Sequence, residues 1–339
     1  MSRPAPATTS WPASHRDPVP VILRALVAAL VLGLVPAGVP ADASALIPTD
    51  PGRPVPATLR GVTTESITRL GALDRALRRH EATPTVRVVF QAGEPAASYA
   101  PAVRRLRRHA YLLGQPFDST ATRAVTVDGY RDRVASYVAR FGDRVDLWEI
   151  GNELNGSWVG LPKDIDAKVA AAFDVVEKDH AAEHLRSVIT LNYWPSHDCY
   201  AHPWEATVSF ARQLPRRVRH GVDYVLLSFY ETACSPRAHP TDAQFRRTFR
   251  RLGRIFPHAR LGMGEVGAQR RSDGLPANPS LAEKQRIARR YYGLQPAMSK
   301  AFGDRWVGGY FWWYYYQDAV TAPRSRSLWP MLDRLLARL

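Results

Sequence analysis

Residues 224–230, Tyr-Val-Leu-Leu-Ser-Phe-Tyr, are apolar along almost their whole length. A strand without an alternating polar face is typical of a parallel sheet, in which both faces are covered. The stretch is followed at residues 242–256 by a segment whose arginines recur at helical spacing. We therefore interpret it as a buried strand followed by an amphipathic helix, the repeating unit of α/β proteins.

The same strand–helix unit recurs eight times between residues 58 and 339. Eight units over about 280 residues match a single-domain (β/α)8 TIM barrel in number and size. The alternative, an open doubly wound sheet, is typically marked by a glycine-rich phosphate loop after its first strand. Residues 61–66, Gly-Val-Thr-Thr-Glu-Ser, are not such a loop, so the barrel is favoured. The predicted strands are residues 58–64, 85–91, 110–114, 146–151, 187–193, 224–230, 260–265 and 307–315. The predicted helices are residues 67–80, 99–108, 127–141, 164–184, 203–214, 242–256, 281–302 and 328–339.

The composition excludes several classes of protein. With 45% hydrophobic and 23% charged residues, the chain is neither mainly disordered nor a polytopic membrane protein. A formal net charge of +15, from 46 basic and 31 acidic residues, raises the question of polyanion binding. All but five of the basic residues are arginine, and many recur at helical spacing. We interpret them as solvated helix faces and expect no nucleic-acid partner.

The first 45 residues have the layout of an export signal. The apolar run at 25–35 has 11 residues, which suits a signal-peptide core and is too short for a membrane span of ~20 residues. We assign residues 1–45 to a signal peptide and the proline-rich residues 46–57 to a linker. An uncleaved anchor is the alternative. Both interpretations predict a secreted or cell-surface protein, with no stable membrane insertion once the signal is cleaved.

The chain has two cysteines, Cys199 and Cys234. In an exported protein such a pair favours a disulfide, with two separate thiols as the alternative. Because they follow the predicted fifth and sixth strands, a bond would join two loops at the same end of the barrel. His197 and His202 lie beside Cys199, but no third ligand has a suitable spacing for a metal. We expect neither a metal nor an organic cofactor.

Two carboxylates stand where the predicted strands four and seven end. Residues 147–156 read Leu-Trp-Glu-Ile-Gly-Asn-Glu-Leu-Asn-Gly, and residues 261–267 read Leu-Gly-Met-Gly-Glu-Val-Gly. In a TIM barrel the chemistry takes place at the carboxyl ends of the strands. Strands four and seven face each other there, so Glu153 and Glu265 are expected to flank a cleft. Cleavage of a glycoside requires such a pair. Asn152 is placed to hydrogen-bond a sugar 2-hydroxyl.

The pair Asn152-Glu153 after strand four, with Glu265 ending strand seven, resembles the clan A glycoside hydrolases. These are retaining TIM-barrel enzymes that include cellulases, mannanases, xylanases, galactanases and β-xylosidases. The resemblance spans roughly residues 58–339. Many members continue Asn-Glu-Pro, whereas this chain has Leu154, so we assign no family within the clan.

The resemblance implies a role for each matching residue. Glu153 would be the general acid/base and Glu265 the nucleophile. Tyr230, at the end of strand six, would orient the nucleophile. Trp312 or Trp313 would form the floor of the subsite next to the scissile bond. Such a mechanism needs two environments that push the carboxyl pKa values apart, that of Glu153 upward and that of Glu265 downward.

Two more tryptophans fall at or beyond strand ends, Trp158 after strand four and Trp194 after strand five. Sugar rings stack on flat aromatic faces, so we expect both to contact substrate. The alternative is that they pack in the core.

A second glutamate of strand four, Glu149, is expected inside the barrel. A charge in that position needs a partner, and Arg87 on strand two is the candidate. We interpret Arg87 and Glu149 as a structural ion pair. The alternative is that the pair holds Glu265 ionised.

The sequence therefore predicts a secreted, monomeric, retaining glycoside hydrolase that cleaves O-glycosidic bonds of a poly- or oligosaccharide. Two alternatives remain at this point. One is a catalytically silent carbohydrate-binding barrel at the cell surface, and the other is a cationic protein that binds acidic polymers. No residue selects the sugar or distinguishes endo from exo action.

Overall fold

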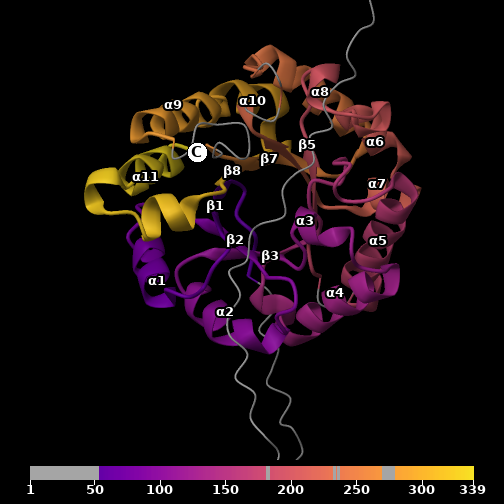
Figure 1. Cartoon of the computed structure of the whole chain (residues 1–339), viewed down its shortest axis with the longest axis horizontal. Coiled ribbons are helices and arrows are strands. Elements are labelled where there is room, and N and C mark those ends of the chain that lie inside the picture. Colours follow the sequence, from indigo (N-terminus) through magenta and orange to yellow (C-terminus); the bar gives the residue numbers. More distant parts are fainter. Residues whose placement is uncertain (1–52, 181–183, 232–233, 235–236, 269–278) are drawn as a thin grey trace, which may run out of the picture. The chain divides into compact units, whose positions relative to one another are not determined.

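Eight parallel strands close into a barrel in the computed structural model of the chain (Figure 1). Each strand pairs with the next in chain order, and the eighth pairs with the first. This closure confirms the predicted (β/α)8 TIM barrel and excludes an open sheet. The strands are β1 (Leu59–Thr64), β2 (Thr85–Val89), β3 (Tyr111–Gln115), β4 (Leu147–Gly151), β5 (Ser187–Asn192), β6 (Tyr224–Phe229), β7 (Arg260–Val266) and β8 (Trp306–Trp312).

The structure describes residues 53–180, 184–231, 234, 237–268 and 279–339. The predicted signal peptide, residues 1–45, and residues 46–52 of the predicted linker lie outside these ranges. None of the helices within these ranges is long and apolar enough to cross a membrane.

Helices surround the barrel on its outside (Figure 1). Several predicted helices differ in extent from those observed, and the helix expected at 203–214 is a 3-10 turn followed by an α-helix that begins at Thr207. The helix expected at 164–184 ends its α-helical part at Asp174 and continues as a short π-helical turn. The helix expected at 281–302 is two helices. The described helices are α1 (Leu70–Arg78), α2 (Ala100–Leu106), α3 (Ser119–Thr122), α4 (Val127–Phe141), α5 (Pro162–Asp174), α6 (Thr207–Gln213), α7 (Arg216–Gly221), α8 (Asp242–Ile255), α9 (Leu281–Tyr292), α10 (Gln295–Phe302) and α11 (Trp329–Ala337).

The outer helices turn an apolar face to the barrel and a cationic face to solvent. On α8, Phe245, Phe249 and Leu252 are buried against the core. The arginines of the opposite face are exposed, as expected for a solvated helix face: Arg247, Arg250, Arg251 and Arg254.

The barrel interior has an apolar layer below and a polar layer above. The apolar layer is one cluster of buried side chains: Leu59, Leu113, Leu147, Val188, Tyr224, Leu226, Val307 and Phe311. Strand side chains alternate between faces, so residues two positions further along point into the same interior. Those positions on β3 to β6 are polar and buried: Gln115, Glu149, Thr190 and Ser228. The strands thus place polar groups at the carboxyl end of the barrel, above an apolar base.

The amino-terminal end of the barrel is covered by residues of the predicted linker. Arg53 donates two hydrogen bonds to the carboxylate of Asp146, at 2.7 and 2.8 Å. Val55 packs against the apolar layer. The last part of that segment therefore contacts the barrel directly.

Candidate active site

The two carboxylates singled out in the sequence lie together at the carboxyl end of the barrel. Glu265 belongs to β7, and Glu153 lies two residues beyond β4. Both approach the hydroxyl of Ser228 on β6, which is 2.7 Å from Glu153 Oε1 and 3.4 Å from Glu265 Oε2. The two carboxylate oxygens are therefore at most about 6 Å apart, the sum of these distances.

A bulge in β7 turns Glu265 into the barrel. The register against β6 shifts by one residue just before Glu265. The preceding Gly264 already faces the interior, since a β-carbon there would lie 2.9 Å from Thr190 Cγ2 and 3.0 Å from Leu226 Cβ. Regular alternation would then direct Glu265 outward, and the extra residue reverses this. The bulge and the missing side chain at position 264 together place the carboxylate in the site.

Glu265 is held by donors on both of its oxygens. Arg87 Nη1 donates to Oε1 at 2.9 Å and Asn152 Nδ2 donates to the same oxygen at 2.7 Å. The hydroxyl of Tyr230 donates to Oε2 at 2.9 Å. Glu265 is only 3% exposed, so these contacts replace water around the carboxylate. They favour its charged form.

Arg87 also pairs with Glu149, deeper in the barrel. Its Nη2 donates to Glu149 Oε1 at 3.0 Å, and its Nε lies 2.9 Å from Oε2 as an ion pair without a directed hydrogen bond. Burial raises the pKa of Glu149 to about 7, although the charge of Arg87 opposes that shift. One guanidinium thus bridges Glu149 and Glu265. Arg87 is therefore placed for both roles considered in the sequence analysis: an ion pair with Glu149, and support of the charged form of Glu265.

Glu153 is positioned by its backbone and by two serines. Its φ of +50° lies in the left-handed region, which non-glycine residues rarely adopt. Its carboxylate accepts hydrogen bonds from Ser228 Oγ at 2.7 Å on Oε1 and from Ser119 Oγ at 2.9 Å on Oε2. Its carbonyl accepts from Asn192 Nδ2 at 3.2 Å. A strained backbone held by several contacts is typical of a functional position.

The electrostatics of the two carboxylates differ. Burial, and then the nearby charge of Glu265, raise the pKa of Glu153 to about 8. Burial raises the pKa of Glu265 as well, contrary to the expected lowering, while Arg87 and Asn152 oppose the shift. Because only Glu265 has a guanidinium beside it, we assign the negative charge of the pair to Glu265 and the proton to Glu153 near neutral pH.

Asn152 was expected to face a sugar hydroxyl, but its side chain makes hydrogen bonds within the protein. Its amide NH2 donates to Glu265 and reaches Glu149 Oε1 at 3.5 Å, while its carbonyl accepts from the backbone N–H of Ser119 at 3.1 Å. The side chain is 3% exposed. In this structure Asn152 positions Glu265, and contact with a sugar hydroxyl stays a prediction.

Two of the predicted substrate-stacking tryptophans are adjacent. Trp158 and Trp194 meet edge to face, with ring centroids 6.4 Å apart. Both are partly exposed. Trp158 Nε1 donates to Ser119 Oγ at 3.1 Å, so its indole connects through that hydroxyl to Glu153. This pair therefore lies on the Glu153 side of the site.

Trp312 does not fit the role expected for it. Its side chain is fully buried in the shell between the barrel and the helices, and its Nε1 donates to Asp318 at 2.9 Å. Phe311 faces the barrel interior, so its neighbour Trp312 points the other way. Trp313 is partly exposed just beyond the end of β8, and its contact with substrate stays a prediction.

Loops at the same end of the barrel are joined by a disulfide between Cys199 and Cys234. It links the segments that follow β5 and β6, as the sequence suggested. His197 beside it is an exposed side chain paired with Asp198 at 3.1 Å. Among the residues that the structure describes, no group of three or more His, Cys, Asp and Glu side chains is placed to hold a metal ion.

Sequence reasoning missed the two serines that contact Glu153. Ser228 is the one hydroxyl in the apolar core of the stretch 224–230 between its two tyrosines, and a polar residue in an otherwise apolar strand is a usable signal. Ser119 begins the short α3 and has no comparable signal, because only the folded chain brings it to Glu153.

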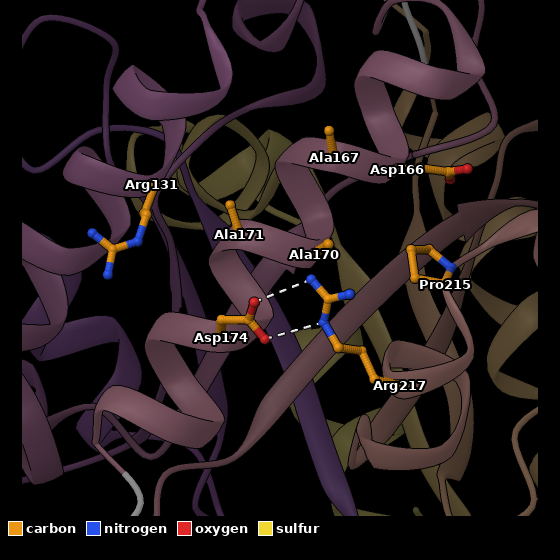
Figure 2. A pocket seen from close by; sticks show the side chains of 8 residues that line it. All are labelled: Arg131, Asp166, Ala167, Ala170, Ala171, Asp174, Pro215 and Arg217. Atoms are coloured by element: carbon orange, nitrogen blue, oxygen red, sulfur yellow. Dashed lines mark hydrogen bonds and ion pairs between the residues drawn. The ribbon is translucent and has the colours of Figure 1, made fainter.

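A hollow of about 470 Å³ lies elsewhere, on the outer helices, lined by side chains of α4, α5 and the start of α7 (Figure 2). Two of its charged groups pair with each other, and a third pairs with a residue outside the lining. Asp174 accepts two hydrogen bonds of 3.1 Å from Arg217, and Arg131 pairs with Asp179 at 2.7 Å. Burial raises the pKa of Asp166, at its edge, to about 6. The hollow contains neither of the carboxylates above and is not part of the candidate site.

Comparison with known proteins identifies the fold. No family model and no curated protein matches the sequence. Solved structures with a similar fold include glycoside hydrolases. Fungal β-1,4-galactanases match at 14% identity and a TM-score of 0.52, over 83% of this chain and 100% of theirs. A family 1 β-glucosidase from Thermotoga maritima matches at 12% identity and 0.51, over 76% and 89%. A GH5-4 broad-specificity endoglucanase from an uncultured bacterium matches at 12% and 0.50, over 81% and 86%.

Proposed function

We propose that this protein is a glycoside hydrolase that acts with retention of anomeric configuration. The observation that carries the proposal is the pair of carboxylates across the barrel mouth. Burial and the charge of Glu265 raise the pKa of Glu153 to about 8, which favours a proton on Glu153 near neutral pH, while Arg87, Asn152 and Tyr230 donate to Glu265 and favour its charged form. A proton donor facing an anion is the arrangement that glycoside cleavage needs.

The reaction follows from these two states. Glu153 protonates the leaving oxygen while Glu265 attacks the anomeric carbon and forms a glycosyl ester. Glu153, now ionised, removes a proton from water, and the resulting hydroxide displaces Glu265 from the sugar. Arg87 stabilises Glu265 as a carboxylate before the first step and after the second.

Retention is supported by the separation of the two groups. Inverting enzymes need roughly 6.5–9.5 Å between their carboxyl groups to admit a water molecule, whereas retaining enzymes use about 5–5.5 Å. The shared contact with Ser228 limits the nearest oxygens of Glu153 and Glu265 to about 6 Å. The bound applies to the nearest oxygens of the two groups, and a separation within it is compatible with direct attack by Glu265.

The substrate proposed is a poly- or oligosaccharide. The partly exposed Trp158, Trp194 and Trp313 offer flat apolar faces for sugar rings near the carboxylates. The matched structures are named for galactan, glucoside and glucan substrates, so the fold does not choose among sugars. With the predicted signal peptide at residues 1–45, the enzyme would act outside the cytoplasm.

The test is an activity screen of the protein on polysaccharides and aryl glycosides of different sugars. Glu265→Gln and Glu153→Gln should each lower kcat by at least about 10³-fold with the fold intact, because each removes one half of the acid–nucleophile pair. Glu81→Gln, an exposed glutamate beyond the end of α1, is the matched control and should retain full activity. Tight binding of a glycan without turnover would instead indicate a carbohydrate-binding barrel.

A further inference from the structure

We propose that Ser228 is a positioning residue that gives Glu153 a hydrogen-bond partner in both of its protonation states, by turning its hydroxyl hydrogen between Glu153 and Glu265. The consequence for turnover rests on the proposed glycosidase function. The physical basis is the position of one hydroxyl between two carboxylates.

Ser228 lies on β6 inside the barrel and is fully buried. Its Oγ is 2.7 Å from Glu153 Oε1 and 3.4 Å from Glu265 Oε2. A serine hydroxyl has one hydrogen to donate and two lone pairs that accept. It can therefore donate to one carboxylate while it accepts from the other.

The direction of these bonds depends on Glu153. When Glu153 is ionised, the hydroxyl hydrogen points to its nearer oxygen. When Glu153 carries a proton, that O–H donates to Ser228 Oγ, and the serine hydrogen turns to Glu265. No covalent bond breaks, because the proton stays on Glu153 and only the hydroxyl rotates.

A general acid/base passes through both states in each turnover. A partly buried carboxyl group that loses its partner in one state is destabilised in that state. Ser228 removes this penalty without moving Glu153. It also makes the two carboxylates titrate as a linked pair, since the same hydrogen serves both.

Ser119 provides a matched comparison. It is a second hydroxyl on Glu153, 2.9 Å from the other oxygen, and it accepts from Trp158 Nε1 at 3.1 Å. Its described contacts are with Glu153, Asn152 and Trp158, and none is with Glu265. Removing Ser119 therefore deletes a similar hydrogen bond without touching the link to the nucleophile.

The test is a titration of Glu153 by carbon-13 NMR in protein labelled at the glutamate carboxyl carbon, with the signal assigned by its loss in Glu153→Gln. The midpoint of the Glu153 titration is measured in three proteins that carry Glu265: the wild type, Ser228→Ala and Ser119→Ala. It is then measured in the same three proteins with Glu265→Gln added. We expect Ser228→Ala to move the midpoint upward by about one pH unit, because a donor to the carboxylate is lost. That displacement should change by at least about half a pH unit in the Glu265→Gln background, since the amide replaces the carboxylate that is the second partner of Ser228.

The displacement caused by Ser119→Ala should be the same in both backgrounds. Equal displacements for Ser228→Ala in both backgrounds would overturn the proposal. Ser228→Cys keeps a weaker donor, so its Glu153 midpoint should lie between those of the wild type and Ser228→Ala. If Ser228→Ala folds poorly, Ser228→Cys can replace it in the comparison of the two backgrounds.

Turnover separates this proposal from the proposed function. Ser228→Ala should lower kcat by about 10-fold on a substrate with a poor leaving group and less on an activated aryl glycoside, with KM little changed. A wild-type protein with the linked titration and no turnover on any sugar would support the Ser228 link and contradict the glycosidase. Turnover in which Ser228→Ala has no effect on kcat, together with unlinked titrations, would contradict the Ser228 link alone.

Discussion

Glu153 combines two features that cost folding free energy. Its backbone has a φ of +50°, and its carboxyl group is desolvated beside a second carboxylate. The contacts that hold it are made by Ser119, Ser228 and Asn192. A residue that is both strained and electrostatically unfavourable is better explained by what it does than by any contribution to stability.

The desolvation of Glu153 predicts that the stability difference between the wild type and Glu153→Gln depends on pH. The pKa of Glu153 lies at about 8 in the folded protein, above its ordinary value of 4.5, so the folded state binds this proton more tightly than the unfolded state. Its contribution to stability is therefore fully present below about pH 4.5 and is lost as the pH rises through about 8. Glu153→Gln cannot ionise and should escape this loss. Its Tm should exceed that of the wild type by several degrees more at pH 9 than at pH 5.

Calorimetry at a series of pH values measures this difference. Glu81→Gln, at an exposed position, is the control for the effect of the Glu-to-Gln substitution itself. Parallel Tm curves for the wild type and Glu153→Gln would mean that Glu153 titrates normally in the folded protein.

At the scale of elements, the decisive feature is the bulge in β7. It turns Glu265 inward directly after Gly264, which also faces the interior. Strand β5, which is separated from β7 by β6, contributes Thr190 to the interior, and the Thr190 hydroxyl donates to Glu149. The strand geometry and the charge network of the site are thus coupled at position 264.

Gly264→Ala tests this coupling. A β-carbon at 2.9 Å from Thr190 Cγ2 requires a shift of β5 or β7, so we expect a lower Tm and a fall in kcat of at least about 10-fold. The control is Gly71→Ala in α1, where the nearest atom would be Arg75 Nη1 at 3.6 Å and alanine favours the helix. The test compares the Tm and the kcat of Gly264→Ala with those of Gly71→Ala. Wild-type activity in Gly264→Ala would show that the bulge does not set the position of Glu265.

The bulges also explain what the sequence could and could not predict. The order of strands and helices follows from hydrophobic periodicity, and it located Glu153 and Glu265 at strand ends. The direction of an individual side chain depends on strand register, and β7 breaks the alternation before Glu265. Choosing between Trp312 and Trp313 required the same knowledge of β8, whose register against β1 and β7 also shifts. Contacts such as Ser119 with Glu153 come from segments far apart in the chain and needed the folded structure.

At the scale of the whole molecule, the fold and the chemistry are separate arguments. The matched galactanase, β-glucosidase and endoglucanase share the barrel at 12–14% identity, so the likeness is one of fold alone. What points to glycoside cleavage in this chain is its own interior, an apolar base with a polar layer above it that ends in two facing carboxylates. The exposed arginines of an outer helix such as α8 lie on the face turned to solvent.

The central claim is that Glu265 forms a covalent bond to the sugar, and chemical trapping tests it most directly. The wild-type protein is incubated with activated 2-deoxy-2-fluoro glycosides of several sugars, which slow release of the intermediate, and the site of attachment is located by peptide mass spectrometry. We predict one glycosyl group per chain on the peptide that contains Glu265, and none in Glu265→Gln. Attachment to a different carboxylate, or hydrolysis of a natural substrate with an inverted product, would contradict this account.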